Sequence, residues 1–426
     1  MAPTPPDDDD AHALFERWVD AEVESGAELD LDVLCADSPA LRPQVEALIR
    51  GFRALDMALP SVGDVGSPVA PDVLGYAVGE LIGEGGMGEV WRAEQLEPVR
   101  RPVALKVIKS RPDLDRLALR FEFERQAQAA LDHPAIARIY DAGVTADGRP
   151  FFSMEPVHGP PIHTYCDENR LPVRRRLELF AEVCDGVLHA HRRGLIHRDL
   201  KPSNILVTEV DGAPQPKIID FGIAKTVGQA TGDGVAAGGP TLTELGQLVG
   251  TPAYMSPEQA NPVHAADVDT RSDVYSLGVV LFELLVGDRP RAPWATDGGD
   301  GAETAAPSTH IQQLGDRAGE VARARGVQAP RLRRLLRGDV DWIVLKALEP
   351  RRQDRYGSPA ELAADLRRHF RDEPVWAGPT GIAYRLKKLF RRHRTAVGGA
   401  TLGLLILLGT LAGLSVGLKR AIEAER

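Results

Sequence analysis

The order of apolar patterns along this chain constrains its fold more than any other feature. From Gly75 onward, the short apolar runs YAVGELIG, GEVWRAEQ and PVALKVIK predict β-strands. A helical stretch, LDRLALRFEFERQAQAALDH, and the strand-like runs ARIYDAG and PFFSMEPV come next, and helical patterns dominate after about Tyr165. A strand-rich block followed by a helix-rich block predicts two lobes of the α+β class.

The segment before this block has a different composition. Residues 1–59 begin with an acidic run and continue with helical spacing of apolar residues, which predicts a small helical module. Residues 60–75 are rich in Pro, Gly and Ser and predict a linker. We interpret the module either as a docking element for a partner or as a structural appendage.

The C-terminal part predicts a membrane anchor. Residues 396–418 form 23 consecutive positions without a charge, and as a helix they would span about 35 Å, against roughly 30 Å for the hydrocarbon core. Six Lys or Arg lie in residues 385–394, before this run. The positive-inside rule then predicts a single-pass helix in the inner (plasma) membrane, a cytoplasmic domain before it, and a short extracytoplasmic tail at 419–426.

The basic juxtamembrane segment, residues 371–395, also bears on partners. Its charges are expected to attract anionic lipids, so that residues 385–418 contact membrane lipid, or to act as a topology signal alone. Gly409, Gly413 and Gly417 recur every four residues. This spacing permits close helix packing in a homodimer, although glycine is common in membrane helices generally. Both the dimer and the presence of a further domain after the helix stay open.

Composition excludes other classes of protein. The net charge is −10, with 51 Lys and Arg against 61 Asp and Glu, so the chain lacks the basic footprint of a nucleic-acid-binding protein. Cys35, Cys166 and Cys184 are too few and too scattered for a disulfide framework or a Cys-rich zinc site. A reducing compartment is therefore the expected environment for most of the chain.

A glycine cluster lies between the first two predicted strands. It fits the pattern G-x-G-x-x-G-x-V with Gly83, Glu84, Gly85, Gly86, Met87, Gly88, Glu89 and Val90. Glycine lets backbone N–H groups approach phosphate oxygens where a side chain would clash. Dinucleotide-binding turns use similar glycines, but a helix follows them at once, whereas a predicted strand, EVWRAEQ, follows here. The cluster therefore predicts a phosphate-binding loop between two strands.

A lysine follows on the third predicted strand. Lys106, in the run VALK, can hold phosphates as a point charge. It needs a carboxylate to fix its position, and the next predicted helix offers Glu122 and Glu124.

The segments HRDLKPSN and DFG carry the remaining polar groups. Asp199 can accept a proton from an incoming hydroxyl. Asn204 offers a neutral oxygen to Mg²⁺, and Asp220 offers an anionic one. Because Mg²⁺ prefers one or two carboxylates together with substrate phosphates, this sparse set is sufficient for it.

Taken in order, these motifs resemble those of the eukaryotic-like protein kinase superfamily. The Gly-rich loop, VALK, HRDLKPSN, DFG and SPE (Ser256–Glu258) follow the family order. Runs such as GEGGMGEVW and GTPAYMSPEQA are similar to bacterial serine/threonine kinases with a single membrane span. The resemblance implies a bilobal kinase domain at 76–370, with an N-lobe at 76–158 and a C-lobe at 159–370.

The resemblance also implies roles for residues at matching positions. The catalytic residues would be Asp199 as base, Lys201 at the γ-phosphate, and Lys106 with Glu124 as its partner. Asn204 and Asp220 would hold Mg²⁺, for which Mn²⁺ could substitute. The ATP-binding residues would be Ile82, Gly83, Glu84, Gly85, Gly86, Met87, Gly88, Glu89, Val90, Ala104, Lys106, Glu155, Val157 and Leu206, with Met154 as gatekeeper.

Further matching positions imply structural support. Glu258 would pair with Arg355. Asp273, in RSDVYSLG, would brace the catalytic loop from a buried helix.

Regulation is implied by residues near the activation loop. Arg198, directly before the implied base, resembles the arginine of kinases that are switched by phosphorylation of this loop. Thr241 and Thr243 are interpreted either as phosphorylation sites or as ordinary exposed threonines.

The implied activity is transfer of phosphate from ATP to protein hydroxyls. Lys201 and Thr251 follow the Ser/Thr-type pattern, so the expected substrates are Ser and Thr of proteins, this chain included, in membrane-associated signalling. The alternative is a catalytically weak pseudokinase scaffold, which would require the loss of Lys106, Asp199 or Asp220. None of these is lost.

Overall fold

The computed structural model describes residues 34–35, 41–42, 45–46, 49, 69–85, 88–108, 131–221, 252–260, 268–290, 304–392, 403, 406–411 and 413–415. The chain divides into two compact units, residues 1–69 and 70–426. The first unit has buried apolar residues at Leu34, Cys35, Leu41, Val45 and Ile49. The second unit holds every element named below.

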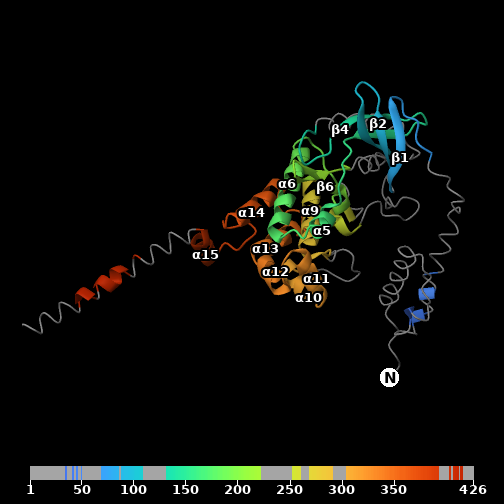
Figure 1. The fold of residues 1–426 in the computed structure, drawn as a ribbon. Helices are drawn as coiled ribbons and strands as arrows, with labels where there is room; N and C mark the ends of the chain where they lie inside the picture. Colours follow the sequence, from blue (N-terminus) through green and yellow to red (C-terminus); the bar gives the residue numbers. More distant parts are fainter. Residues whose placement is uncertain are drawn as a thin grey trace, which may run out of the picture. The chain divides into compact units, whose positions relative to one another are not determined.

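Five antiparallel strands form the N-terminal sheet (Figure 1). They are β1 (Tyr76–Gly85), β2 (Gly88–Gln95), β3 (Arg101–Ile108), β4 (Ile139–Val144) and β5 (Pro150–Met154), in the order β1-β2-β3-β5-β4. Alternate residues face opposite sides. Trp91, Leu105 and Val107 pack on one face, and Ala104 packs with Phe152 on the other. The strand patterns predicted this sheet.

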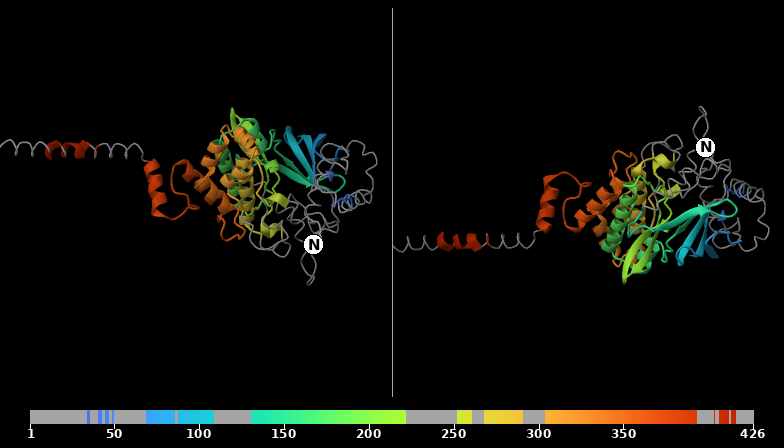
Figure 2. Two further views of the ribbon diagram at one scale, coloured as in Figure 1. Left: turned by 90° about the horizontal axis from the view of Figure 1, so that it is seen from below. Right: turned by 90° about the horizontal axis from the view of Figure 1, so that it is seen from above.

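Helices make up most of the rest of this unit (Figure 2). They are α5 (Ile162–Glu168), α6 (Val173–His191), α8 (Pro257–Ala260), α9 (Thr270–Val286), α10 (Pro307–Gln313), α11 (Arg317–Ala324), α12 (Ala329–Leu336), α13 (Asp339–Ala347), α14 (Pro359–Phe370) and α15 (Ile382–Arg392). Helix α6 packs against α9 and α14. Two lobes, one a sheet and one helical, agree with the α+β prediction.

Helix α9 is the centre of the helical lobe. Almost all of its residues are buried, which fits a helix that is apolar on nearly every side. The Asp269 side chain caps its start by accepting a hydrogen bond from the Arg271 N–H at 2.7 Å. Gly287 ends it in the left-handed conformation, with φ of 72°.

A short hairpin interrupts the helical region. Strands β6 (Ile205–Val210) and β7 (Ala213–Ile218) form it, just after the 3₁₀ turn at Pro202–Asn204. Helical patterns were predicted to dominate after Tyr165, and this hairpin departs from that expectation because Pro214 and Pro216 weaken the strand signal of β7.

The segment that links the lobes, residues 155–161, packs directly on this hairpin. The Val207 N–H donates to the Pro160 carbonyl at 3.0 Å. A Cβ at Gly159 would lie 1.9 Å from the Val207 carbonyl oxygen, so only glycine allows the backbones to approach this closely.

Some predicted segments fall partly or wholly outside the described residues. The helix predicted after β3 lies outside them apart from its last three positions. Within the predicted span at 396–418, Gly403, Ile406–Leu411 and Gly413–Ser415 are described and helical, and the rest, like the tail at 419–426, is not described. Among the described residues, no helix combines the length and the apolar character needed to cross a membrane.

Candidate active site

The segment between α6 and β6 is held by a buried carboxylate of α9. Asp273 Oδ2 accepts from the His197 N–H at 2.8 Å, and Oδ1 accepts from the Arg198 N–H at 2.8 Å. His191 Nε2, from the end of α6, lies 2.7 Å from Oδ2. Burial opposes ionisation of Asp273, but these bonds, first that of His191, lower its pKa below the ordinary value. The implied brace is therefore present.

His197 links this segment to the residues after β7. Its Nε2 lies 3.1 Å from the Ile219 carbonyl, and its ring lies 4.7 Å from the Phe221 ring. Because a carbonyl only accepts, Nε2 carries the proton, and Nδ1 accepts from the Asp199 N–H at 3.3 Å. Burial lowers the pKa of His197, so the ring is neutral at pH 7.

Three predicted catalytic and metal-binding residues meet on this segment. Asp199 Oδ2 lies 3.2 Å from Lys201 Nζ and 3.2 Å from Asn204 Nδ2. Asn204 Nδ2 also donates to the Asp199 carbonyl at 2.8 Å. The Asn204 amide is thereby oriented, with its oxygen turned away from Asp199. Arg198 has a positive φ of 63°, a conformation held by the two backbone bonds to Asp273.

Lys106 reaches across from the sheet to the same region. Its Nζ lies 2.7 Å from Asp220 Oδ1, and both side chains are partly exposed. Asp220 also has a positive φ, of 59°. The predicted partner Glu124, and the less favoured Glu122, lie outside the described residues. The structure thus shows Lys106 paired with the implied metal ligand.

The predicted nucleotide-binding residues of the sheet lie on neighbouring strands. Ala104 pairs with Met154 across β3 and β5, and Val90 pairs with Lys106 across β2 and β3. A Cβ at Gly88 would lie 2.3 Å from the Val107 carbonyl oxygen, so this glycine is required where the loop returns to the sheet. Ile82 is exposed on β1.

The glycine loop itself is described only in part. Gly83, Glu84 and Gly85 end β1, and Gly88 begins β2, whereas Gly86 and Met87 lie outside the described residues. The Glu89 carboxylate accepts from Trp91 Nε1 at 3.3 Å and lies 3.4 Å from Arg149 Nη1. The Glu89 side chain is therefore held by Trp91 and Arg149, and its implied part in ATP binding stays a prediction.

The segment linking the lobes presents backbone groups selectively. The Glu155 N–H donates to the Arg138 carbonyl at 2.8 Å, so this N–H is already satisfied within the protein. The Val157 N–H makes no hydrogen bond within the part of the chain that the structure describes. Leu206, on β6, forms a bridge with Pro161 at the end of this segment.

Lys217 belongs to this arrangement and was not predicted. Its Nζ lies 2.9 Å from Glu155 Oε1, which fixes the Glu155 side chain. It comes from β7, a strand that the sequence pattern did not reveal, so only the residue type could have suggested it.

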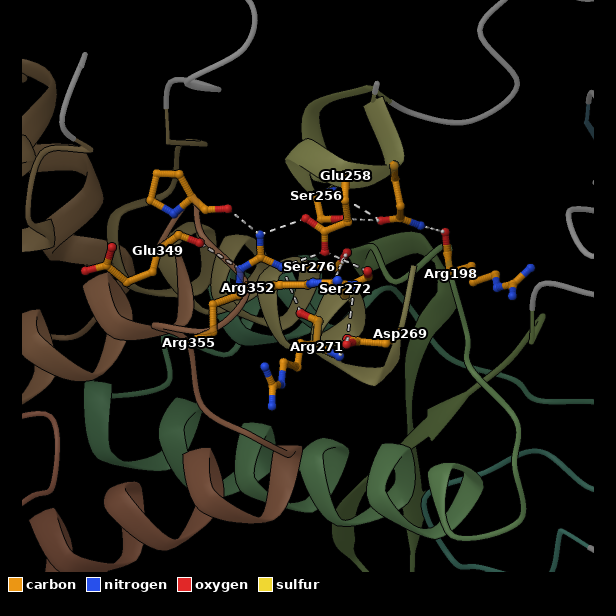
Figure 3. Close-up of polar contacts among 12 residues, drawn as sticks. Arg198, Ser256, Glu258, Asp269, Arg271, Ser272, Ser276, Glu349, Arg352 and Arg355 are labelled. Carbon is orange, nitrogen blue, oxygen red and sulfur yellow. Dashed lines mark hydrogen bonds and ion pairs between the residues drawn. The ribbon is translucent and has the colours of Figure 1, made fainter. Parts of the chain in front are cut away.

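A buried ion pair lies next to the segment that carries Arg198 and Asp199 (Figure 3). Arg355 donates to both Glu258 oxygens, at 2.7 and 2.8 Å, and Ser272 donates to Oε1 at 2.7 Å. Burial would raise the pKa of Glu258, yet the bonds from Arg355 and Ser272 outweigh it and bring the pKa to about 2. The implied Glu258–Arg355 pair is present. Gln259, beside it, donates to the Arg198 carbonyl at 3.0 Å.

The polar groups suit Mg²⁺ bound together with phosphates. In the described residues, no three His, Cys, Asp or Glu side chains form a group that could hold a metal ion by themselves. The oriented Asn204 oxygen and the second carboxylate oxygen of Asp220 offer two hard ligands. This is the partial set that Mg²⁺ uses when phosphates complete its coordination.

Several residues of the motifs and of the region between them lie beyond what the structure describes. Gly222 of DFG and the threonines Thr241, Thr243 and Thr251 lie outside the described residues. Their roles stay predictions.

The sheet, the helical lobe and the polar groups between them together define a protein kinase domain. Residues 76–323 match the family model of the protein kinase domain, and this is more than half of the chain. The chain therefore belongs to the protein kinase family.

The relatives that the chain matches are bacterial serine/threonine kinases. Serine/threonine-protein kinase PknB of Mycobacterium tuberculosis is 38% identical over 309 residues, which cover 70% of this chain and 43% of PknB. Serine/threonine-protein kinase pkn3 of Myxococcus xanthus is 42% identical over 218 residues, 50% of this chain and 38% of pkn3. The chain thus spans less than half the length of these curated relatives.

Solved kinase structures are also similar. The crystal structure of the Mycobacterium tuberculosis PknI kinase domain shares 26% sequence identity, with a TM-score of 0.47. The match covers 71% of this chain and 98% of that one.

Proposed function

We propose that this chain transfers the γ-phosphoryl group of ATP to Ser and Thr hydroxyls of proteins, itself included. One observation carries the proposal. The Asp199 carboxylate lies 3.2 Å from Lys201 Nζ, on the segment held by Asp273. The Lys106–Asp220 pair, with its atoms 2.7 Å apart, lies on the sheet side of the same region. A base, two cations and a metal ligand therefore converge where phosphates would lie.

The chain's own groups divide the work of this reaction. Asp199 orients the substrate hydroxyl and accepts its proton as the new P–O bond forms, while the bond between the γ-phosphorus and the β–γ bridging oxygen breaks and ADP leaves. Lys201, beside Asp199, offsets the negative charge of the γ-phosphoryl group during its transfer. Lys106 holds the α- and β-phosphates, and its pairing with Asp220 keeps the ammonium near them before ATP binds. Asn204 and Asp220 would hold Mg²⁺, which would supply positive charge to offset that of the phosphate oxygens.

Replacing the base tests the assignment. In Asp199→Asn we expect turnover to fall by about 10²- to 10⁴-fold, the usual range for losing a general base. Binding of ATP should change little, because Asp199 contacts the hydroxyl rather than the nucleotide. Turnover is measured as phosphate transfer from Mg·ATP to a generic basic protein, and ATP affinity by equilibrium binding.

The matched control is Asp211→Asn. Asp211 lies exposed in the turn between β6 and β7, with φ of 52°, a conformation that Asn tolerates well. We expect this variant to keep normal turnover. Unchanged turnover in Asp199→Asn would contradict the proposed mechanism.

We also propose that the chain is attached to a membrane through residues 396–418. The uncharged run of 23 residues and the six basic residues in 385–394 support this. Ile406, Leu407, Leu408 and Leu411, all helical, are exposed to solvent. The full chain should stay with membranes after an alkaline wash, whereas Leu407→Arg combined with Leu411→Arg should release it. Release of the unmodified chain would refute the attachment.

A further inference from the structure

Helix α15 is attached to the helical lobe by its polar residues. Tyr384 Oη donates to Asp339 Oδ1 at 2.9 Å, and Lys388 forms a buried ion pair with the same carboxylate. Arg392 Nη1 lies 3.2 Å from Glu373. Residues 384, 388 and 392 are spaced by four, so they lie on one face of the helix. This polar face is the one that contacts the protein.

The chain leading into α15 is fixed as well. Asp365, in α14, accepts from the Trp376 N–H at 2.8 Å and from the Ala377 N–H at 2.9 Å. Val375, next to them, is buried, and the Trp342 ring of α13 packs edge-on against Tyr384 at 5.3 Å. Two carboxylates, Asp339 and Asp365, therefore set the position of α15 on the lobe.

The opposite face of α15 is apolar and exposed. Ile382 is 83% exposed, Leu386 46%, Leu389 53% and Phe390 48%. At 3.6 residues per turn these four side chains lie on the side of the helix away from Tyr384 and Lys388. A surface helix of a water-soluble domain has the reverse arrangement, with its apolar stripe against the core. The exposed face of α15 therefore needs an apolar partner.

The charges beside this face select the kind of partner. Arg385 is exposed on the helix, and the sequence has no Asp or Glu between Glu373 and Glu423. A second copy of α15 would bring like charges together, whereas an anionic surface would be attracted. An exposed apolar face flanked by basic residues is the composition of helices that lie in a membrane interface. The uncharged run also begins shortly afterwards, at Ala396.

We propose that α15 lies in the interface of an anionic lipid bilayer, and that its polar face holds the helical lobe against that surface. Ile382, Leu386, Leu389 and Phe390 enter the acyl boundary, and the basic residues meet the head groups. The contacts of Asp339 with Tyr384 and Lys388 then fix the orientation of the kinase domain relative to the bilayer. This proposal deepens the membrane attachment proposed above and rests on it.

A fluorescence experiment on the full chain tests the proposal. Leu389→Trp places a reporter on the exposed face, and Leu335→Trp places the same reporter at an exposed leucine of α12 (44%). Each variant is incorporated into vesicles of phosphatidylcholine and phosphatidylglycerol whose acyl chains are brominated near the head groups. The fluorescence added by the reporter at position 389 should fall about twofold or more, since interfacial helices lie roughly 5–10 Å into this boundary. The fluorescence added by the reporter at position 335 should not change.

Flotation of the vesicles separates the outcomes. In one outcome the chain floats with the vesicles while the two reporters, at positions 389 and 335, are quenched equally. This result would overturn the interfacial helix but would leave the membrane attachment intact. A chain that does not float overturns both. Leu386→Trp, one turn earlier, serves as the reporter if Leu389→Trp fails to fold, which loss of phosphate transfer would reveal.

Discussion

The helical side and the sheet side of the candidate site are built differently. On the helical side, Asp273 is completely buried and holds the backbone of His197 and Arg198. On the sheet side, Lys106 is partly exposed and pairs with Asp220, which is also partly exposed. Folding of the helical lobe therefore fixes the segment that carries Asp199, whereas Lys106, proposed to hold the phosphates, is expected to contribute little to stability. Substitutions on each side should separate these two contributions.

The largest effect is expected from Asp273→Asn. The amide would turn a donor toward the backbone N–H of His197 or Arg198 and would leave His191 without its charged partner. We expect the free energy of unfolding to fall by about 4 kcal/mol, because a buried backbone N–H and the amide donor that faces it would both lack an acceptor, at about 1–3 kcal/mol each. Turnover should fall by about 100-fold, because the catalytic segment loses its position. Urea unfolding and phosphate transfer measure the two effects.

Asp269→Asn is the matched control on the same helix. Asp269 caps the start of α9, and Asn caps helices as well as Asp does. Stability and turnover should both be kept. Equal losses of stability and turnover in Asp269→Asn and Asp273→Asn would mean that Asp273 has no special role in holding the His197–Arg198 backbone.

A smaller loss of stability is expected from Glu258→Gln. The pKa of Glu258 is about 2 in the folded protein, against an ordinary value of 4.5. Because folding lowers this pKa, the carboxylate stabilises the fold fully above pH 4.5 and loses that contribution as the pH falls toward 2. The variant should lose about 3 kcal/mol at pH 7.

Unfolding measured across this pH range checks the sign. The difference in free energy of unfolding between wild type and Glu258→Gln should shrink as the solution becomes acidic. Glu258→Leu combined with Arg355→Leu should recover part of the loss, because no buried charge is then left unpaired. A difference that stays constant with pH would contradict the assigned pKa.

The smallest effect on stability is expected from Lys106→Met. A partly exposed ion pair contributes at most about 1 kcal/mol, so the free energy of unfolding should change by less than this. The ratio kcat/KM should nevertheless fall by about 10²-fold or more, because a cation at the phosphates is lost.

Arg92→Met is the control for the sheet side. It removes an exposed ion pair with Glu80 on the neighbouring strand, 2.7 Å apart, and should leave both stability and kcat/KM nearly unchanged. A large loss of stability in Lys106→Met would mean that the sheet side and the helical side of the site contribute alike to the free energy of unfolding.

Local patterns predicted the regular elements well. The runs GEVWRAEQ and PVALKVIK coincide with β2 and nearly with β3, since alternation of apolar residues reports strands directly. Pro359 lies in the first turn of α14, a position that proline favours. The prolines of β7 disrupted the strand signal, so the hairpin that carries Lys217 was not predicted.

The site shows a second limit of the sequence. The order of motifs implied which residues belong to the site and some of their partners, such as Arg355 for Glu258, but not all of them. His191 reaches Asp273 across 82 positions, and nothing local to either residue indicates this contact. The same holds for α15, whose basic and apolar composition was visible in the sequence. Only its contacts with Asp339 show which face is bound to the lobe.

The tight contact between the linking segment and the β6–β7 hairpin has a mechanical consequence. Pro160, Pro161 and the Glu155 carboxylate are all bonded to residues of that hairpin. Residues 155–161 and the hairpin are therefore expected to move as one body whenever the sheet and the helical lobe shift relative to each other. A nucleotide base held by this segment, as the proposed function requires, would then keep its position relative to the helical lobe.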